Sequence, residues 1–273
     1  MPSLEALHPL LITAGLCLLV QFISWLWQWK TNNTDIVDIS WTILIVTCAL
    51  VYFFTAQGEK FHSSIILLVP ILWYSRLAWH LISRYQINHE DGRYQALRKH
   101  WQANGIAPLQ TKLLFFFLFQ ALLAWFFSYP AYIISNLEQT FSAFDMAAIL
   151  LLCVSLIGVT VADWQLSQFK KSGHKGVCNV GLWKYSRHPN YFFEWIHWFC
   201  YPLIGFSLET HLTIDGLILL LAPFVMLIFL FKLTGIPFNE EQNIRSKGDA
   251  YRRYQKTTNM FFLGKPKVLK EAP

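Results

Sequence analysis

Seven apolar stretches, each close to 20 residues long, follow one another along this chain of 273 residues. A helix of about 20 apolar residues crosses the hydrocarbon core of a bilayer. Backbone amides in hydrocarbon must be hydrogen bonded within the chain, so these stretches are predicted to be helices. The chain is therefore expected to be one all-α domain, residues 1–273, forming a polytopic membrane bundle of seven transmembrane helices. The predicted spans are 7–29, 37–56, 63–83, 113–135, 144–166, 190–207 and 214–233.

The composition excludes several other classes of protein. Hydrophobic residues make up 55% of the chain and charged residues only 14%, against about 25% charged residues in ordinary soluble domains. The five cysteines are scattered and include no Cys-x-x-Cys pair, which argues against a disulfide framework or a metal site. No nucleic-acid recognition fold fits between the spans, so nucleic acid is not an expected partner.

The distribution of Lys and Arg predicts an orientation. With seven spans, 20 of the 22 basic residues fall on one side of the membrane. By the positive-inside rule this side is cytoplasmic. We therefore expect a multi-pass protein of the bacterial inner membrane, with its N-terminus outside and its C-terminus in the cytoplasm. Attraction to anionic membrane lipids is a simpler explanation of the same basic face, and it stays open.

Ionisable residues inside the predicted spans are candidates for function, because each costs about 2.5–3.5 kcal/mol on insertion. Asp145 lies at the outer end of its span and is expected to be a solvated helix cap. Arg76 and Arg84 are eight residues apart and fall on roughly one helix face. Two interpretations remain open for Arg76: an interhelical ion pair with Asp38 or Glu194, or a site for a polyanionic ligand. The residues at membrane depth are Asp38, Arg76, His80, Asp163, Glu194 and His197.

The segment 181–194 carries the most informative pattern. Pro189 suits the first turn of a helix, because proline has no N–H to leave unpaired there. The exposed helix N-terminus would then offer its N–H groups to a phosphate, with Arg187 and His188 beside it. Asn190 shares a helix face with the glutamate four residues later, and this pair can hydrogen bond an amide or a ribose.

The tail adds a third polar element. Glu240 and Glu241 are followed by Arg245, and then by tyrosines and basic residues in the run 251–256. This spacing predicts an amphipathic C-terminal helix on the cytoplasmic membrane surface. One interpretation is a polybasic lipid anchor. The other is a cofactor site, because aromatic rings interleaved with cations suit stacking on a purine and pairing with a phosphate.

These motifs together resemble the steroid 5α-reductase-like family of membrane reductases, in particular its bacterial branch. The run from Ser186 to Tyr191, with the later Glu-Glu and Tyr-x-x-Tyr, is shared with isoprenylcysteine methyltransferases. The elements at Asp38, Arg76 and 90–94 favour the reductases. The resemblance rests on Asp38-Ile-Ser-Trp41, Arg76-Leu77, Glu90-Asp-Gly-Arg-Tyr94, Ala162-Asp163-Trp164, Gly181 through Glu194, Gly235-Ile-Pro237 with Glu240-Glu241, and Gly248 through Tyr254.

The resemblance implies an NADPH-dependent oxidoreductase acting on CH–CH bonds, of the 3-oxo-5α-steroid 4-dehydrogenase type. Its substrate would be a hydrophobic enone lipid taken from the bilayer, such as a 3-oxo-Δ4 steroid, and we expect a monomer. The alternatives are an S-adenosylmethionine-dependent methyltransferase and a non-catalytic lipid-binding protein. The predicted cofactor-binding set is Arg76, Arg84, Asp163, Lys170, Arg187, His188, Asn190, Tyr191, Glu194, Glu241, Arg245, Tyr251, Arg252 and Tyr254.

The catalytic assignment departs from the family pattern. The steroid reductases use a Gln-Glu pair at the start of the second helix, and here that helix begins Asp35-Ile-Val-Asp38. We predict that Asp38, protonated or hydrogen bonded, and Tyr74 of the third helix polarise the substrate carbonyl. A buried neutral carboxyl can donate such a hydrogen bond. This departure from the family pattern argues against a steroid as the specific substrate, but it does not argue against reduction.

Overall fold

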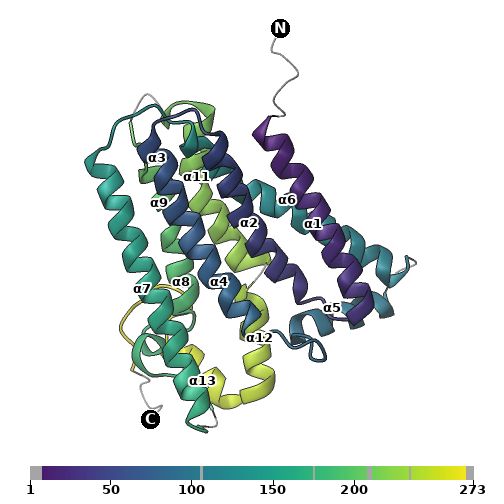
Figure 1. The fold of residues 1–273 in the computed structure, drawn as a ribbon. Coiled ribbons are helices and arrows are strands. Elements are labelled where there is room, and N and C mark those ends of the chain that lie inside the picture. Colours follow the sequence, from purple (N-terminus) through teal and green to yellow (C-terminus); the bar gives the residue numbers. More distant parts are fainter. Residues whose placement is uncertain (1–7, 105–106, 175, 208–210, 234, 269–273) are drawn as a thin grey trace. The chain divides into compact units, whose positions relative to one another are not determined.

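The computed structural model describes residues 8–104, 107–174, 176–207, 211–233 and 235–268, in which the regular elements are all helices (Figure 1). The predicted all-α class is therefore confirmed. The chain divides into two compact units, an N-terminal unit, Met1–Phe141, and a C-terminal unit, Ser142–Pro273. Each unit holds part of the predicted site and is described by itself.

Three long helices form the centre of the N-terminal unit. The helices α1 (Pro9–Thr31), α2 (Ile36–Thr55) and α6 (Leu109–Ser135) pack against one another. α1 ends at Asn32, whose left-handed backbone (φ 53°) lets its N–H bond the carbonyl of Gln28. This turn places the loop 32–35 directly before α2, so the polar residues of the loop stay at the helix end.

The third apolar stretch is one helical run with a local widening. It passes from α3 (Lys60–Ile66) through a π-helical segment (Leu67–Leu72) to α4 (Trp73–Ile82). Pro70 lies in the widened segment, where it removes one backbone donor and crowds the preceding turn. A polar helix, α5 (Gly92–Ala103), follows and packs on α6.

The C-terminal unit begins with its longest helix, α7 (Ala143–Lys171). Ser142 and Asp145 form a reciprocal capping box at its start, which confirms the predicted cap. The predicted solvation of Asp145 is wrong, because this side chain is fully buried and also accepts a hydrogen bond of 2.8 Å from the N–H of Gly205. The carboxylate satisfies a loop amide that would otherwise be buried without a partner.

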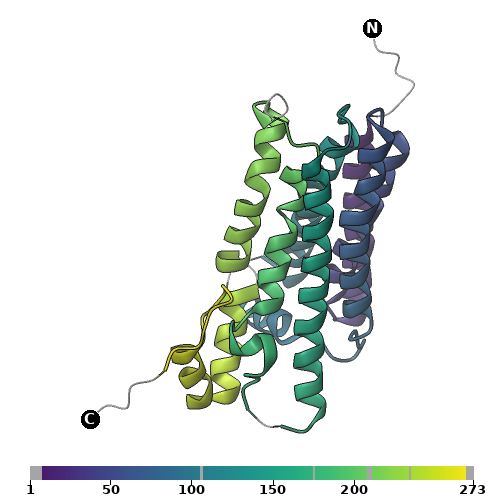
Figure 2. The ribbon, with the colours of Figure 1, turned by 90° about the vertical axis from the view of Figure 1, so that its left-hand side faces the viewer.

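Two short helices, α8 (Pro189–His197) and α9 (Cys200–Leu203), pack along α7 (Figure 2). A Cβ atom at Gly158 of α7 would lie 2.3 Å from the ring of Phe193, so glycine permits this close approach. The chain continues through α11 (Ile214–Ile228), a π-helical segment (Phe229–Leu233), α12 (Gly235–Lys247) and α13 (Asp249–Thr257).

Six helical stretches in the described residues are long and apolar enough to cross a membrane. They support a multi-pass membrane protein, and they carry exposed apolar side chains such as Ile157 of α7. The predicted sixth span, 190–207, is not confirmed, because α8 and α9 break it into pieces of nine and four residues. The orientation of the termini and the surface position of the tail stay predictions.

Candidate functional site

The carboxylate of Glu240 on α12 is the centre of the polar network in the C-terminal unit. Its Oε1 atom accepts from Arg187 Nε at 3.0 Å, His188 Nε2 at 2.7 Å and the Tyr251 hydroxyl at 2.7 Å. Its Oε2 atom accepts from Arg187 Nη2 at 2.9 Å and Gln255 Nε2 at 2.7 Å. We call these five residues the Glu240 cluster. They join the start of α8 to α12 and α13.

Arg187 is held on further sides by the backbone of the tail. Its Nη1 atom donates to the carbonyls of Gln255 and Thr258, at 3.1 and 2.8 Å. Only 8% of Arg187 and 4% of His188 is exposed. The expectation that both residues stand beside an open helix N-terminus is therefore wrong. A phosphate could reach either one only after its bonds to Glu240 break.

The two tail tyrosines are also buried. Tyr254 donates to the backbone carbonyls of Trp183 and Ser186, and Tyr251 donates to Glu240. Burial raises the pKa of both phenols, so both remain protonated donors at neutral pH. Their observed contacts tie α13 to the segment before α8, and they do not present a ring face for a purine.

Tyr191 lies on the first turns of α8 and completes the contact with α12. Its ring stacks on His188, with centroids 5.6 Å apart, and its hydroxyl accepts from Asn239 Nδ2 at 2.6 Å. A Cβ atom at Gly235 would lie 2.5 Å from the Tyr191 ring. The glycine therefore lets the start of α12 approach this ring.

A second polar group joins α7 to α8. Asn190 Nδ2 donates to Asp163 Oδ1 at 3.3 Å. Glu194 follows one turn later on α8, and its Oε1 atom lies 3.8 Å from His197 Nδ1. Asp163, Asn190 and Glu194 are all partly exposed. The structure therefore pairs Asp163 with Asn190 and places Glu194 one turn later on the helix of Asn190. The three residues offer carboxylate and amide groups that can bind ligand hydroxyls.

The remaining predicted cations of this unit lie at its surface. Arg245 pairs with Glu241 and Arg252 with Asp249, and all four side chains are exposed. Exposed pairs of this kind contribute about 0–1 kcal/mol, so an anion can replace the carboxylate at little cost. Lys170 is also exposed, near the end of α7.

In the N-terminal unit, Asp38 is tied to the start of α5. Its Oδ2 atom accepts from Arg93 Nη2 at 3.1 Å and its Oδ1 atom from the Tyr94 hydroxyl at 2.7 Å. Both oxygens of Asp38 therefore act as acceptors here. Asp38 is therefore hydrogen bonded to Arg93 and Tyr94, and its predicted role at a substrate carbonyl stays a prediction.

The neighbouring loop is fastened to the same helix start. Glu90 accepts from Arg98 Nε at 3.0 Å and from the N–H of Thr34 at 2.8 Å. Both carboxylate oxygens of Asp35 accept from the N–H of Asp91, at 3.0 and 3.1 Å. The motif 90–94 thus has an observed structural role: it holds the loop 32–35 and positions Asp38.

Trp41 lies on α2 three residues after Asp38, and two aromatic side chains pack against it. The Trp41 ring meets Tyr74 and Phe127 edge to face, with centroids 5.8 and 6.1 Å apart. Its indole Nε1 atom is buried and has no hydrogen-bond partner among the residues that the structure describes. Tyr74 is fully buried. The sequence analysis quoted Trp41 only as part of a motif and gave it no role.

Arg76 and Arg84 belong to this unit as well. Arg76 is partly exposed on α4, and Arg84 lies just beyond the end of that helix, where its Nη1 atom is 3.3 Å from His80 Nε2. The observed ion-pair partner of Asp38 is Arg93. A cofactor role for Arg76 and Arg84 stays a prediction.

Replacing Asp35 by asparagine is expected to stabilise the protein at pH 7.5. Burial, followed by the charges of Asp91, Asp38 and Glu90, raises the pKa of Asp35 from its ordinary value of 3.8 to about 6, despite the opposing hydrogen bond from the Asp91 N–H. A group with a raised pKa contributes most stability below its unfolded pKa and loses that contribution as the pH rises through its folded pKa.

Asparagine keeps the acceptor and removes the charge, so we expect a gain of about 1 kcal/mol at pH 7.5 after allowance for solvent screening. The gain should shrink toward pH 5, where Asp35 of the wild type is largely protonated. Thermal midpoints of both proteins across this pH range test the prediction. A difference that is constant with pH would contradict it.

Comparison with known proteins places the chain in a protein family. The family described as "Protein of unknown function (DUF1295)" matches residues 24–258. A protein of Schizosaccharomyces pombe, named only as uncharacterized protein C594.04c, is 25% identical over 202 residues. The alignment covers 64% of this chain and 58% of the yeast protein, so the chain spans less than two thirds of that relative. No solved structure matches the chain.

Proposed function

The chain belongs to the DUF1295 family, and we propose that it is an NADPH-dependent membrane reductase. Its reaction would be reduction of the C=C bond of a conjugated enone lipid, such as a 3-oxo-Δ4 steroid. The observation that carries the proposal is the buried indole N–H of Trp41, which has no protein acceptor among the described residues.

A buried donor without an acceptor costs about 1–3 kcal/mol, and a bound carbonyl oxygen would remove this cost. Trp41 lies about 8 Å along α2 from Ile36, at 1.5 Å per residue. Its neighbours Tyr74 and Phe127 are apolar over most of their surface. A hydrophobic ligand with one carbonyl oxygen matches these surroundings, whereas a highly polar ligand does not.

The reaction needs its strongest hydrogen bonds at the carbonyl oxygen. When bound, NADPH supplies a hydride to the β-carbon of the enone. The C=C electron pair would then shift toward the carbonyl, and the oxygen would carry negative charge until the α-carbon takes a proton from water. The Trp41 N–H would stabilise that oxygen. Tyr74, whose ring meets the Trp41 ring edge to face, is the second donor of this proposal. Asp38 would act through Arg93 and Tyr94 and would hold the start of α2 in place.

The donor set of the C-terminal unit fits a phosphorylated nucleotide cofactor in chemical type. Asp163, Asn190 and Glu194 offer acceptors and a donor to ribose hydroxyls. The exposed cations Arg245 and Arg252 suit phosphates. Arg187 and His188 would support this set from within the Glu240 cluster rather than bind the phosphate themselves.

The alternative function is transfer of a methyl group from S-adenosylmethionine, because the run Ser186 to Tyr191 is shared with isoprenylcysteine methyltransferases. Methyl transfer to a thiol or carboxylate does not require a group that donates a hydrogen bond to a carbonyl oxygen, as the Trp41 indole would. The reductase is therefore the better match to the N-terminal unit.

A direct experiment separates the two functions. Detergent-purified protein is heated with NADPH or with S-adenosylmethionine, and its thermal midpoint is measured. We expect stabilisation by NADPH, and NADPH oxidation that depends on an added 3-oxo-Δ4 steroid. Stabilisation by S-adenosylmethionine alone would overturn the proposal. Reactions without steroid control for uncoupled oxidation.

A further inference from the structure

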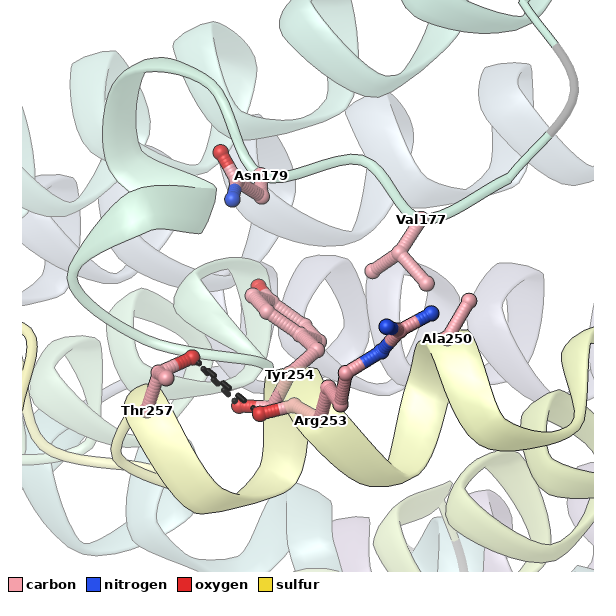
Figure 3. Close-up of a pocket in the computed structure, with 6 residues that line it drawn as sticks. All are labelled: Val177, Asn179, Ala250, Arg253, Tyr254 and Thr257. Carbon is pink, nitrogen blue, oxygen red and sulfur yellow. Dashed lines mark hydrogen bonds between the residues drawn. The ribbon is translucent and has the colours of Figure 1, made fainter. Parts of the chain in front are cut away.

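A small pocket in the C-terminal unit shares only Tyr254 with the residues predicted to bind the cofactor (Figure 3). One side is a single face of α13, formed by Ala250, Arg253, Tyr254 and Thr257, and the loop residues Val177 and Asn179 cover the other. The cavity holds about 220 Å³, which is below the roughly 300–1,000 Å³ of clefts that bury a drug-sized ligand. It can take one small polar group.

The charges around this pocket are positive. Arg253 makes no hydrogen bond or ion pair through its guanidinium with any residue that the structure describes, whereas the adjacent Arg252 is paired with Asp249. No carboxylate is among the six lining residues. Cys178, between the two loop residues, is buried, and the charges of Lys170 and Lys247 act on its thiol. The pocket therefore carries a cation that no carboxylate of the described residues neutralises.

The donors at the pocket match a phosphoryl group. The planar guanidinium of Arg253 can hold two phosphate oxygens at once. Asn179 adds an amide donor on the loop side (Figure 3). The Thr257 hydroxyl donates to the backbone carbonyls of Arg253 and Tyr254, at 3.3 and 3.2 Å, and it can turn toward a better acceptor.

We propose that this pocket binds a phosphate monoester. The pocket is too small for a dinucleotide, so the proposal does not rest on the proposed reductase function. The phosphate can come from the headgroup of phosphatidic acid or from a soluble phosphate. The chemistry of recognition is the same for both, and the experiment distinguishes the two sources.

The test uses the full-length protein without NADPH, so failure of the reductase proposal does not affect it. Arg253→Gln removes the cation, and Ala250→Leu fills the pocket while keeping the cation. Lys256→Gln is the matched control, because Lys256 is exposed on the same helix and does not line the pocket. Thermal midpoints are measured against inorganic phosphate at constant ionic strength, and lipid binding in nanodiscs containing phosphatidic acid or phosphatidylcholine.

We expect the wild type and Lys256→Gln to bind phosphate or phosphatidic acid equally well, and both pocket variants to bind at least tenfold more weakly. A response to inorganic phosphate identifies a soluble ligand, and a response to phosphatidic acid alone identifies the lipid. Equal binding by the wild type and Arg253→Gln would overturn the proposal. So would the absence of any response to either probe.

Discussion

Replacing Glu240 by alanine is expected to destabilise the C-terminal unit by about 3–5 kcal/mol, the usual cost of breaking a buried ion pair from one side. The variant leaves the guanidinium of Arg187 buried, with only backbone carbonyls as acceptors. It also removes the acceptor of His188, Tyr251 and Gln255. The link between α8, α12 and α13 should therefore open before the rest of the unit.

Glu241→Ala is the matched control for this prediction. Glu241 is the next residue and also pairs with an arginine, but both partners are exposed, so its loss should cost at most about 1 kcal/mol. Thermal midpoints and the rate of proteolysis within the tail measure both effects. If the two variants lose similar stability, the Glu240 cluster does not hold the tail in place.

Replacing Trp41 by phenylalanine is expected to lower kcat/KM for enone reduction about 100-fold, the lower range for loss of an oxyanion donor. The aromatic contacts with Tyr74 and Phe127 can remain, because phenylalanine keeps an apolar ring. Without ligand, the same variant should be as stable as the wild type or more so, since it removes a buried donor that has no protein acceptor among the described residues. A purely structural tryptophan would not show opposite effects on activity and stability.

Trp125→Phe provides the matched control in the same unit. The Trp125 indole donates to the carbonyl of Leu10 at 3.0 Å, so its loss should cost about 1 kcal/mol of stability and leave kcat/KM unchanged. Steady-state kinetics and thermal midpoints are measured on both variants. Normal turnover by Trp41→Phe would remove the main support for a carbonyl ligand at α2.

The Glu240 cluster also changes how the motif 186–191 is interpreted. From the sequence, Arg187 and His188 suit direct contact with a phosphate. In the structure they bind Glu240, which lies more than 50 residues later. The motif and the tail therefore form one structural element, and the partly exposed group of Asp163, Asn190 and Glu194 is the better candidate for contact with a cofactor.

Two residues of the N-terminal unit, Asp38 and Trp41, also have contacts that could not be predicted from the sequence. Asp38, protonated or hydrogen bonded, was predicted to polarise the substrate carbonyl. In the structure its carboxylate oxygens accept from Arg93 and Tyr94 of α5. Trp41 lies in one of the quoted motifs, yet only the positions of its neighbours show that its indole N–H has no acceptor in the part of the chain that the structure describes. Neither result follows from residue type or spacing.

The sequence by itself determined the all-helical class and six helices that are long and apolar enough to cross a membrane, because these properties depend on the length and apolarity of a local stretch. It also located the two polar regions that the structure makes into networks. Only the tertiary structure decided that 190–207 is broken into α8 and α9 and that Glu240 binds Arg187 and His188. Only the tertiary structure shows that the Trp41 indole N–H has no acceptor among the described residues. The physical reason is range: a buried polar group is satisfied by whichever partner the fold brings near, and that partner lies far away in the chain.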